Sequence, residues 1–352
     1  MHEKTTRALS KPILVIKFGT ASITKPNGEI NEPTILEISR QVAALHQHYN
    51  IVLVSSGAVG AGKHFVKQYK GEITQRKAAA AIGNPLLVGI YAKFFSAYNI
   101  PIAQSLCERQ HFANRSQFLQ LKETYQELWA NGVIPIANEN DVVSNLELKF
   151  SDNDELATLL AVGLEADTML FSTSVGGLLD TSGQIVPTVK QIDSQILGLA
   201  DDSKSSLGLG GMISKLTFAR MATRMGIKVI IFGIHTPEGI LKALNHETGT
   251  VFVPQVANLS ARQKWLASGS LVMGQIQVDA GAANALQNRK SLLAVGVKKV
   301  SGEFDKGEVV EILDENQSPI AVARTKESSE VLRQNLKKQN VEVANADDIV
   351  LL

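Results

Sequence analysis

Short apolar runs recur along the first two thirds of the chain, with longer helix-like stretches between them. Most runs are rich in Val and Ile and do not alternate with polar residues, a pattern typical of strands buried on both faces of a parallel sheet. The predicted strands are Ile13–Ile16, Ile51–Val54, Ile100–Ala103, Val133–Ala137, Thr168–Phe171 and Val229–Phe232. The predicted helices are Pro33–Tyr49, Arg76–Tyr98, Ser116–Ala130, Asp154–Gly163 and Met212–Met225. Strands that alternate with helices predict an α/β sandwich.

Two helix ends carry recognisable signals. Asp152 or Asn153 is a suitable cap for the helix that begins at Asp154. Gly226 follows the last predicted helix, where a glycine commonly ends a helix in the left-handed conformation.

The pattern changes around Val253–Gly269, where short segments separated by turn residues begin. These segments are Gln275–Asp279, Ser291–Ala294, Glu308–Leu313, Ile320–Ala323 and Asp348–Leu352. We therefore expect two domains, a larger α/β domain over residues 1–258 and a small β-rich domain over residues 269–352.

Polar clusters directly follow several predicted strands. They are Lys17–Ser22, Ser55–Gly57, Asn138–Asp141 and Ser172–Ser174. Ligands of open α/β sheets bind at the carboxyl ends of the strands. We expect these clusters to line one edge of the sheet and to form the functional site.

Composition narrows the class of protein. The chain has 352 residues, 44% of them apolar and 20% charged, and a mean hydropathy of +0.04, as in globular proteins. It contains no run of 18 apolar residues, and residues 1–11 lack the apolar stretch of a signal peptide. A single Cys107, interpreted as a small buried residue rather than a nucleophile, suits a reducing compartment. We expect a cytoplasmic protein without a membrane partner.

Two glycine-flanked lysines, far apart in the chain, suggest phosphoryl transfer. Lys17 precedes Gly19, and Lys215 follows Gly210 and Gly211. Glycine lets backbone N–H groups approach an anion closely, and a lysine adds a mobile positive charge. Neither segment fits the Walker pattern, because no Ser or Thr follows either lysine at the required spacing.

Between the lysines lies a centre rich in Asn and Asp, formed by Asn138–Asp141 and Ser151–Asp154. Such residues also make turns and helix caps without further function. At strand ends they can instead bind a substrate ammonium group or hold the lysines in position. A carboxylate acceptor would need no general base, because it is already ionised at neutral pH. Catalysis would then depend on bringing two anions together and neutralising the moving charge.

These motifs resemble the glutamate 5-kinase family of the amino acid kinase superfamily. The matching segments, in the family's order, are Ile16–Ser22, Val54–Ala58, Asn138–Asp141, Ser151–Asp154 and Gly210–Lys215. The tail resembles the family's PUA domain at Val278–Ala282, Lys290–Leu293 and Gly296. The resemblance implies a three-layer sandwich with a mostly parallel sheet, and ATP-dependent phosphorylation of the γ-carboxylate of L-glutamate in proline biosynthesis.

The resemblance also implies a role for each matching residue. Lys17 and Lys215 would contact the phosphates of ATP, and Asp154 would orient both lysines. Ser56, Asp141 and Asn153 would bind glutamate, with Asp141 facing its ammonium group. The remaining nucleotide contacts would be Gly19, Thr173, Ser174 and the loop formed by Leu209, Gly210, Gly211, Met212, Ile213, Ser214 and Lys215.

Further implications concern cofactors and partners. The family implies Mg²⁺ with the ATP and no metal held by protein ligands. It also implies proline as a feedback inhibitor, a glutamyl phosphate reductase acting downstream, and a homo-oligomer.

The chain departs from the family pattern at three places. Ser174 stands where the family usually has Asp, and this changes one nucleoside contact. Ser151 replaces the glycine that usually precedes Asp152. The strand at Ile320–Ala323 lacks the glycine expected nearby.

Several alternatives deserve comparison. The glycines of Ser56–Gly62 suggest a dinucleotide fold, but Gln75–Ile82 looks helical where that fold needs a second strand with an acidic end. An N-acetylglutamate or aspartate kinase is a closer alternative, although an acetylated substrate has no ammonium group for Asp141 and neither family normally has a PUA-like tail.

An RNA-binding protein is an alternative from a different functional class. Residues 269–352 carry ten Lys/Arg and twelve Asp/Glu, a balance of −2, and we therefore expect no RNA partner.

Overall fold

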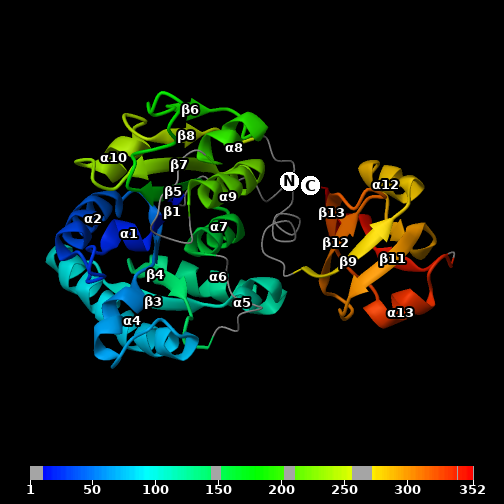
Figure 1. Ribbon diagram of the computed structural model, residues 1–352, viewed down its shortest axis with the longest axis horizontal. Helices are drawn as coiled ribbons and strands as arrows, with labels where there is room; N and C mark the ends of the chain where they lie inside the picture. The colour runs from blue at the N-terminus through cyan, green and yellow to red at the C-terminus, as the bar shows by residue number, and fades with distance from the viewer. Residues whose placement is uncertain (1–10, 144–151, 202–210, 256–271, 339, 352) are drawn as a thin grey trace. The chain divides into compact units, whose positions relative to one another are not determined.

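The computed structural model describes residues 11–143, 152–201, 211–255, 272–338 and 340–351 (Figure 1). The chain divides into two compact units, the first formed by residues 1–108 and 119–257 and the second by residues 109–118 and 258–352. Residues 109–118, which the sequence placed in the first domain, thus group with the second unit. Hydrophobic patterning reports on local structure and does not show which unit a short helix joins.

An eight-stranded sheet forms the centre of the first unit, in the order β3-β4-β2-β1-β5-β7-β8-β6. Its strands are β1 (Ile13–Phe18), β2 (Asn50–Ser55), β3 (Ile102–Cys107), β4 (Ile134–Glu139), β5 (Thr168–Thr173), β6 (Thr188–Val189), β7 (Lys228–Gly233) and β8 (Thr250–Phe252). Neighbouring strands are parallel except β7 and β8, which are antiparallel. The predicted mostly parallel sheet is confirmed.

All six predicted strands are present, but the third begins two residues late, at Ile102. Pro101 has no N–H to donate to a ladder, which delays the start of this strand. Strands β6 and β8 were not predicted, because runs of two and three residues show no periodicity.

The five predicted long helices are also present, with ends that differ by a few residues. The helices are α1 (Thr20–Ile23), α2 (Glu32–Leu45), α3 (Ala58–Gly62), α4 (Ile73–Phe95), α5 (Arg109–Ala113), α6 (Arg115–Ala130), α7 (Asn153–Gly163), α8 (Ser194–Asp201), α9 (Met212–Arg224) and α10 (Gly239–Leu244). Short 3₁₀ turns follow α3 and α4 at η2 (Lys63–Phe65) and η3 (Ser96–Tyr98). Gly226 ends α9 with a φ of +83°, as predicted.

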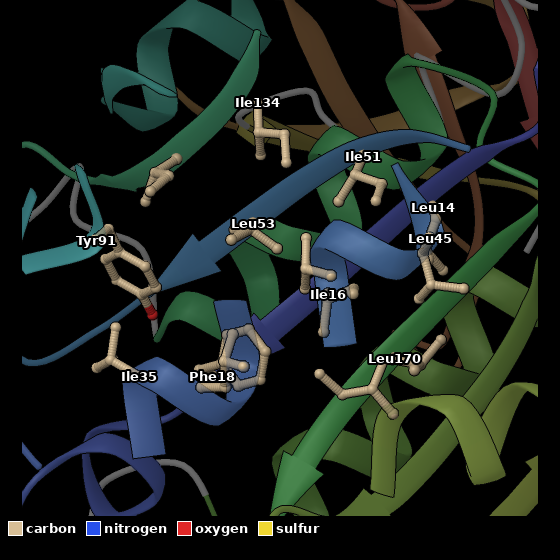
Figure 2. Packing of buried hydrophobic residues seen from close by; sticks show 14 of the residues in the cluster. Leu14, Ile16, Phe18, Ile35, Leu45, Ile51, Leu53, Tyr91, Ile134 and Leu170 are labelled. Atoms are coloured by element: carbon tan, nitrogen blue, oxygen red, sulfur yellow. The ribbon is translucent and has the colours of Figure 1, made fainter. Parts of the chain in front are cut away.

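Alternate residues of the central strands face opposite sides of the sheet. Leu14, Ile16 and Phe18 of β1 pack into one apolar cluster with α2 and α4 (Figure 2). Val15 and Lys17 therefore face the other side, where α7 contacts β1. This alternation directs one cationic side chain of a buried strand toward α7.

Helix α4, with η3, is long and apolar enough to cross a bilayer on length and composition alone. In the structure its Leu87, Tyr91 and Phe95 are buried in the core cluster, so this helix packs as part of the α/β unit.

Helices α3 and α4 cross where neither residue at the contact has a side chain. A Cβ added to Gly83 would lie 1.7 Å from the carbonyl oxygen of Ala58, and one added to Gly62 would lie 1.9 Å from that of Ala79. Both obstacles are backbone atoms, so only glycine permits this approach.

The second unit contains a five-stranded sheet in the order β11-β9-β12-β13-β15 and a separate pair, β10 with β14. Its elements are β9 (Val272–Val278), α12 (Ala280–Gln287), β10 (Leu292–Leu293), η4 (Ala294–Gly296), β11 (Val297–Gly302), β12 (Val309–Leu313), β13 (Pro319–Arg324), α13 (Ser329–Gln334), β14 (Glu342–Ala344), η5 (Ala346–Asp348) and β15 (Ile349–Leu351). It has its own apolar core, which includes Ile276, Val310 and Ala321. The β-rich prediction is correct, although β11 and β14 were not predicted.

The helix crossing gives a stability prediction. Gly83→Ala should lower the free energy of unfolding by about 1–3 kcal/mol, the usual cost of overpacking. Gly89→Ala is the matched control on the same helix, because a Cβ there meets nothing within 4 Å. This control should be neutral or stabilising by about 0.5–1 kcal/mol. Urea unfolding of both variants tests the prediction, and equal midpoints would contradict it.

Candidate active site

Lys17 and Lys215 meet on a single carboxylate. The Nζ atom of Lys17 lies 2.6 Å from Oδ1 of Asp154, and the Nζ atom of Lys215 lies 3.0 Å from Oδ2. The three side chains are 5%, 7% and 0% exposed for Lys17, Lys215 and Asp154 respectively. The structure thus brings together three residues that the sequence assigned to one site. These three residues are called the lysine–aspartate bridge below.

Three elements position the bridge. Lys17 is the penultimate residue of β1, Asp154 lies in the first turn of α7, and Lys215 lies in the first turn of α9. Helix N-termini carry a partial positive charge, which stabilises the anionic Asp154 and would favour an anionic ligand nearby.

Asp152 connects the starts of α7 and α9. Its Oδ1 accepts hydrogen bonds from the backbone N–H groups of Asp154 (2.8 Å) and Glu155 (3.2 Å), and so caps α7. Its Oδ2 accepts a hydrogen bond from the hydroxyl of Ser214 at 2.5 Å. Of the two predicted caps, Asp152 is therefore the correct one, and it also fixes the residue next to Lys215.

The bridge has an excess of one positive charge. Burial, the largest influence, disfavours ionisation of Asp154, but the charges of Lys17 and Lys215 outweigh it and hold the pKa of Asp154 below its ordinary value. Burial is also the main reason that the pKa of Lys215 is lowered, and repulsion from Lys17 adds to it. The attraction of Asp154 opposes this shift only in part. Two buried lysines beside one shared carboxylate are suited to binding an anion.

A second polar network lies at the ends of β2 and β4. The amide Nδ2 of Asn153 donates to the hydroxyl of Ser56 at 2.7 Å and to Oδ1 of Asn138 at 2.9 Å. The Nδ2 of Asn138 donates in turn to Oδ1 of Asn84 at 3.1 Å. Two of the residues predicted to bind glutamate, Ser56 and Asn153, are therefore in direct contact. The third, Asp141, is half-buried in the turn after β4.

Gly19 follows β1 beside the bridge, and a Cβ placed on it would lie 3.5 Å from Nζ of Lys17. Its N–H donates to the hydroxyl of Ser172 at 3.4 Å, and that hydroxyl also contacts the hydroxyl of Ser22 at 2.8 Å. The predicted phosphate-facing N–H therefore has a protein partner in this structure.

The other predicted nucleotide residues occupy two places. Thr173 ends β5 and is half-buried, whereas the neighbouring Ser174 is exposed. Gly211 is the N-cap of α9, and Met212 and Ile213 are its first residues. Leu209 and Gly210 lie outside the described residues.

Sequence reasoning placed Asn138, Asp152 and Ser172 in clusters expected at the site but gave them no individual contact there, and it did not identify Asn84 at all. Asn84 had a usable signal, because Asn84 and Tyr91 are the polar residues in the otherwise apolar or small-residue stretch 78–92. Both are buried, and Tyr91 contacts the hydroxyl of Ser55 at 3.0 Å. An amide in such a stretch needs a polar partner, and this requirement points to a site.

The carboxylates of Asp152 and Asp154 do not fit a protein-held Mg²⁺. Both oxygens of Asp154 contact lysines, and both oxygens of Asp152 accept hydrogen bonds from protein groups. In the part of the chain that the structure describes, no three His, Cys, Asp or Glu side chains gather as a metal site.

A mostly parallel α/β sheet that places two buried lysines on one carboxylate is suited to an anionic ligand. Comparison with known proteins gives the family. Residues 12–233 match the amino acid kinase family, and residues 274–346 match the PUA domain. The glutamate 5-kinase of Haemophilus influenzae strain PittEE is 35% identical over 349 residues, covering 96% of this chain and 95% of that protein.

The glutamate 5-kinase of Moorella thermoacetica is 41% identical over 324 residues, covering 88% of this chain and 84% of that protein. The chain therefore belongs to the amino acid kinase family and, within it, to the glutamate 5-kinases. A carbamate kinase from Giardia shares the fold, with a TM-score of 0.52 at 21% identity over 70% of this chain and all of that one.

The bridge gives a pH-dependent prediction. Asp154→Asn removes the carboxylate that two buried lysines share and should lower the free energy of unfolding by about 3–5 kcal/mol at neutral pH. The folded-state pKa of Asp154 is depressed, so its contribution exists above the unfolded pKa and is lost as pH falls through the folded value. The difference between wild type and variant should therefore shrink below about pH 4.

Urea unfolding from pH 7 to pH 3 measures this difference. Lys93→Gln, which breaks the exposed Lys93–Glu32 pair, is the control and should cost at most about 1 kcal/mol. A difference that stays constant over the pH range would contradict the assignment of the effect to ionised Asp154.

Proposed function

We propose that this chain transfers the γ-phosphoryl group of ATP to the γ-carboxylate of L-glutamate, giving L-glutamyl 5-phosphate, the first step of proline biosynthesis. The observation that carries the proposal is the lysine–aspartate bridge at the carboxyl edge of the sheet. Relatives that match nearly the whole chain are glutamate 5-kinases, and this supports glutamate as the acceptor.

The reaction needs positive groups that neutralise negative charge, and it needs no proton transfer. A γ-carboxylate oxygen attacks the γ-phosphorus of ATP, the bond between that phosphorus and the β–γ bridging oxygen breaks, and ADP leaves. The acceptor is ionised at neutral pH, so no general base is required. The main obstacle is repulsion between two anions, which positive charges at the transferring group overcome.

Lys17 and Lys215 supply those charges in this proposal. Asp154 keeps both amines in one place, and its two oxygens are engaged with the lysines, which gives it an orienting role. Because the bridge is cationic and closed to water, its interactions with a phosphoryl group are stronger than in solvent.

The substrates would lie on either side of the bridge. Ser56, Asn153 and Asp141 would hold glutamate, with Asp141 paired to the ammonium group. The backbone at Gly19 and the start of α9 from Gly211 would hold the phosphates, after the N–H of Gly19 exchanges Ser172 for a phosphate oxygen. Thr173 and Ser174 would contact the nucleoside.

The cofactor and cellular context follow from this assignment. We assign Mg²⁺ to the nucleotide phosphates, since the carboxylates of Asp152 and Asp154 already have protein partners. We propose a cytoplasmic enzyme whose acyl phosphate product is consumed by a reductase. Feedback by proline and a homo-oligomeric state belong to the same proposal.

The direct experiment is an ATP-consumption assay with glutamate, aspartate and N-acetylglutamate in parallel, each with and without proline. Hydroxylamine in the assay traps an acyl phosphate as a hydroxamate. Turnover with glutamate alone, with trapped product, is the expected result. Preference for aspartate or N-acetylglutamate would replace glutamate with that substrate and overturn the proposal.

Removing one cation tests the mechanism. Lys215→Ala should lower kcat about a hundredfold to a thousandfold, because the developing charge loses one stabilising group. Exposed Lys190→Ala is the control and should leave kcat unchanged. Circular dichroism establishes that both variants fold. Full activity in folded Lys215→Ala would exclude a catalytic role for this residue.

A further inference from the structure

Helix α4 places a buried amide next to the proposed substrate residues. Asn84 is 4% exposed, and its Oδ1 accepts a hydrogen bond from Nδ2 of Asn138. Asn138 in turn contacts Asn153, which contacts Ser56. A continuous line of hydrogen bonds thus connects the core helix with two residues proposed to bind the amino acid.

One backbone group fixes the orientation of every amide in this line. The N–H of Glu139 donates to Oδ1 of Asn138 at 2.9 Å. A backbone N–H can only donate, so the oxygen of Asn138 must face it and its Nδ2 must face Asn84. The atom of Asn153 that contacts the same oxygen must then be its NH₂ group. The amide directions therefore follow from the network itself.

The orientation leaves two buried polar atoms without a hydrogen-bond partner among the described residues. They are the Oδ1 of Asn153, an acceptor, and the Nδ2 of Asn84, a donor. Leaving such atoms unpaired costs free energy, so each needs an explanation. In the proposed function, the free oxygen of Asn153 suits the N–H groups of an α-ammonium and repels a carboxylate.

The glycine crossing keeps Asn84 in place. Gly83 precedes it, and the approach of α4 to the carbonyl oxygen of Ala58 leaves no room for a side chain. Ala58 begins α3, two residues after Ser56. The close crossing of α3 and α4 therefore holds Asn84 near the backbone that follows Ser56.

We propose that Asn84 is a positioning residue for the ammonium group of the amino acid substrate. It supplies the acceptor for Asn138, which keeps the Nδ2 of Asn153 turned inward and its Oδ1 available to an N–H donor. This inference rests on the proposed function, because it assigns a direction to one contact of the same substrate site.

The test compares glutamate with glutarate, which has both carboxylates but no ammonium group. In Asn84→Leu, the Nδ2 of Asn138 loses its acceptor, and the amides of Asn138 and Asn153 can rotate. The KM for glutamate should rise about tenfold, the size of one lost hydrogen bond to a charged group. The inhibition constant of glutarate, the KM for ATP and kcat should each change less than about threefold, because none depends on the ammonium contact.

Two further variants make the outcome decisive. Asn84→Asp keeps an oxygen acceptor for Asn138, so its ratio of glutamate KM to glutarate inhibition constant should stay within about threefold of wild type. Leu87→Ala, one turn along α4 and 1% exposed, removes core packing without touching the network and should leave the ratio unchanged. The aspartate variant carries the test alone if the leucine variant does not fold.

An unchanged ratio in folded Asn84→Leu, or a ratio in Asn84→Asp that shifts tenfold, would overturn the positioning role. Wild-type turnover separates the two proposals. If wild type phosphorylates glutamate and the ratio does not move, only the role of Asn84 fails. If wild type does not use glutamate, the proposed function fails and the inference fails with it.

Discussion

The site depends on one buried carboxylate that two lysines share. Asp154 is fully enclosed, and each of its oxygens contacts one lysine amine. Taking three charged groups out of water is costly and is repaid only when the geometry is nearly ideal. The sheet, the start of α7 and the start of α9 must therefore keep their relative positions, and Asp152 connects those two helix starts through the hydroxyl of Ser214.

The two halves of the site differ in the kind of group that each offers to a ligand. The bridge side is cationic, and in the proposed function it selects phosphate by charge. On the other side, beside the proposed ammonium partner Asp141, lies a network of neutral amides and a hydroxyl formed by Ser56, Asn138 and Asn153. A backbone N–H sets the directions of the amides. Neutral hydrogen bonds select by direction rather than by charge, which suits recognition of an amino acid between two anionic groups.

Much of this arrangement could be predicted from the sequence, because hydrophobic runs report buried strands and parallel strands end at one edge. Lys17 follows from that rule, and the glycines before Lys215 mark the second lysine. Resemblance to a known family adds the role of Asp154. The amide of Asn84 in a largely apolar stretch signals a polar partner, but the sequence does not show which partner, because that depends on the close crossing of α3 and α4, a tertiary contact. The very short strands β6 and β8 were missed because tertiary pairing, rather than propensity, defines them.

The central claim is that Lys17 and Lys215 share the carboxylate of Asp154. A double-mutant cycle that measures the free energy of unfolding tests this claim most directly. Lys17→Met, Lys215→Met and the double variant are compared with wild type at pH 7. If both lysines act on one carboxylate, the double variant leaves Asp154 buried without a cation, and its loss should exceed the two single losses together by at least about 1 kcal/mol. Losses that add within about 0.5 kcal/mol would mean that the lysines act independently and would contradict a shared carboxylate.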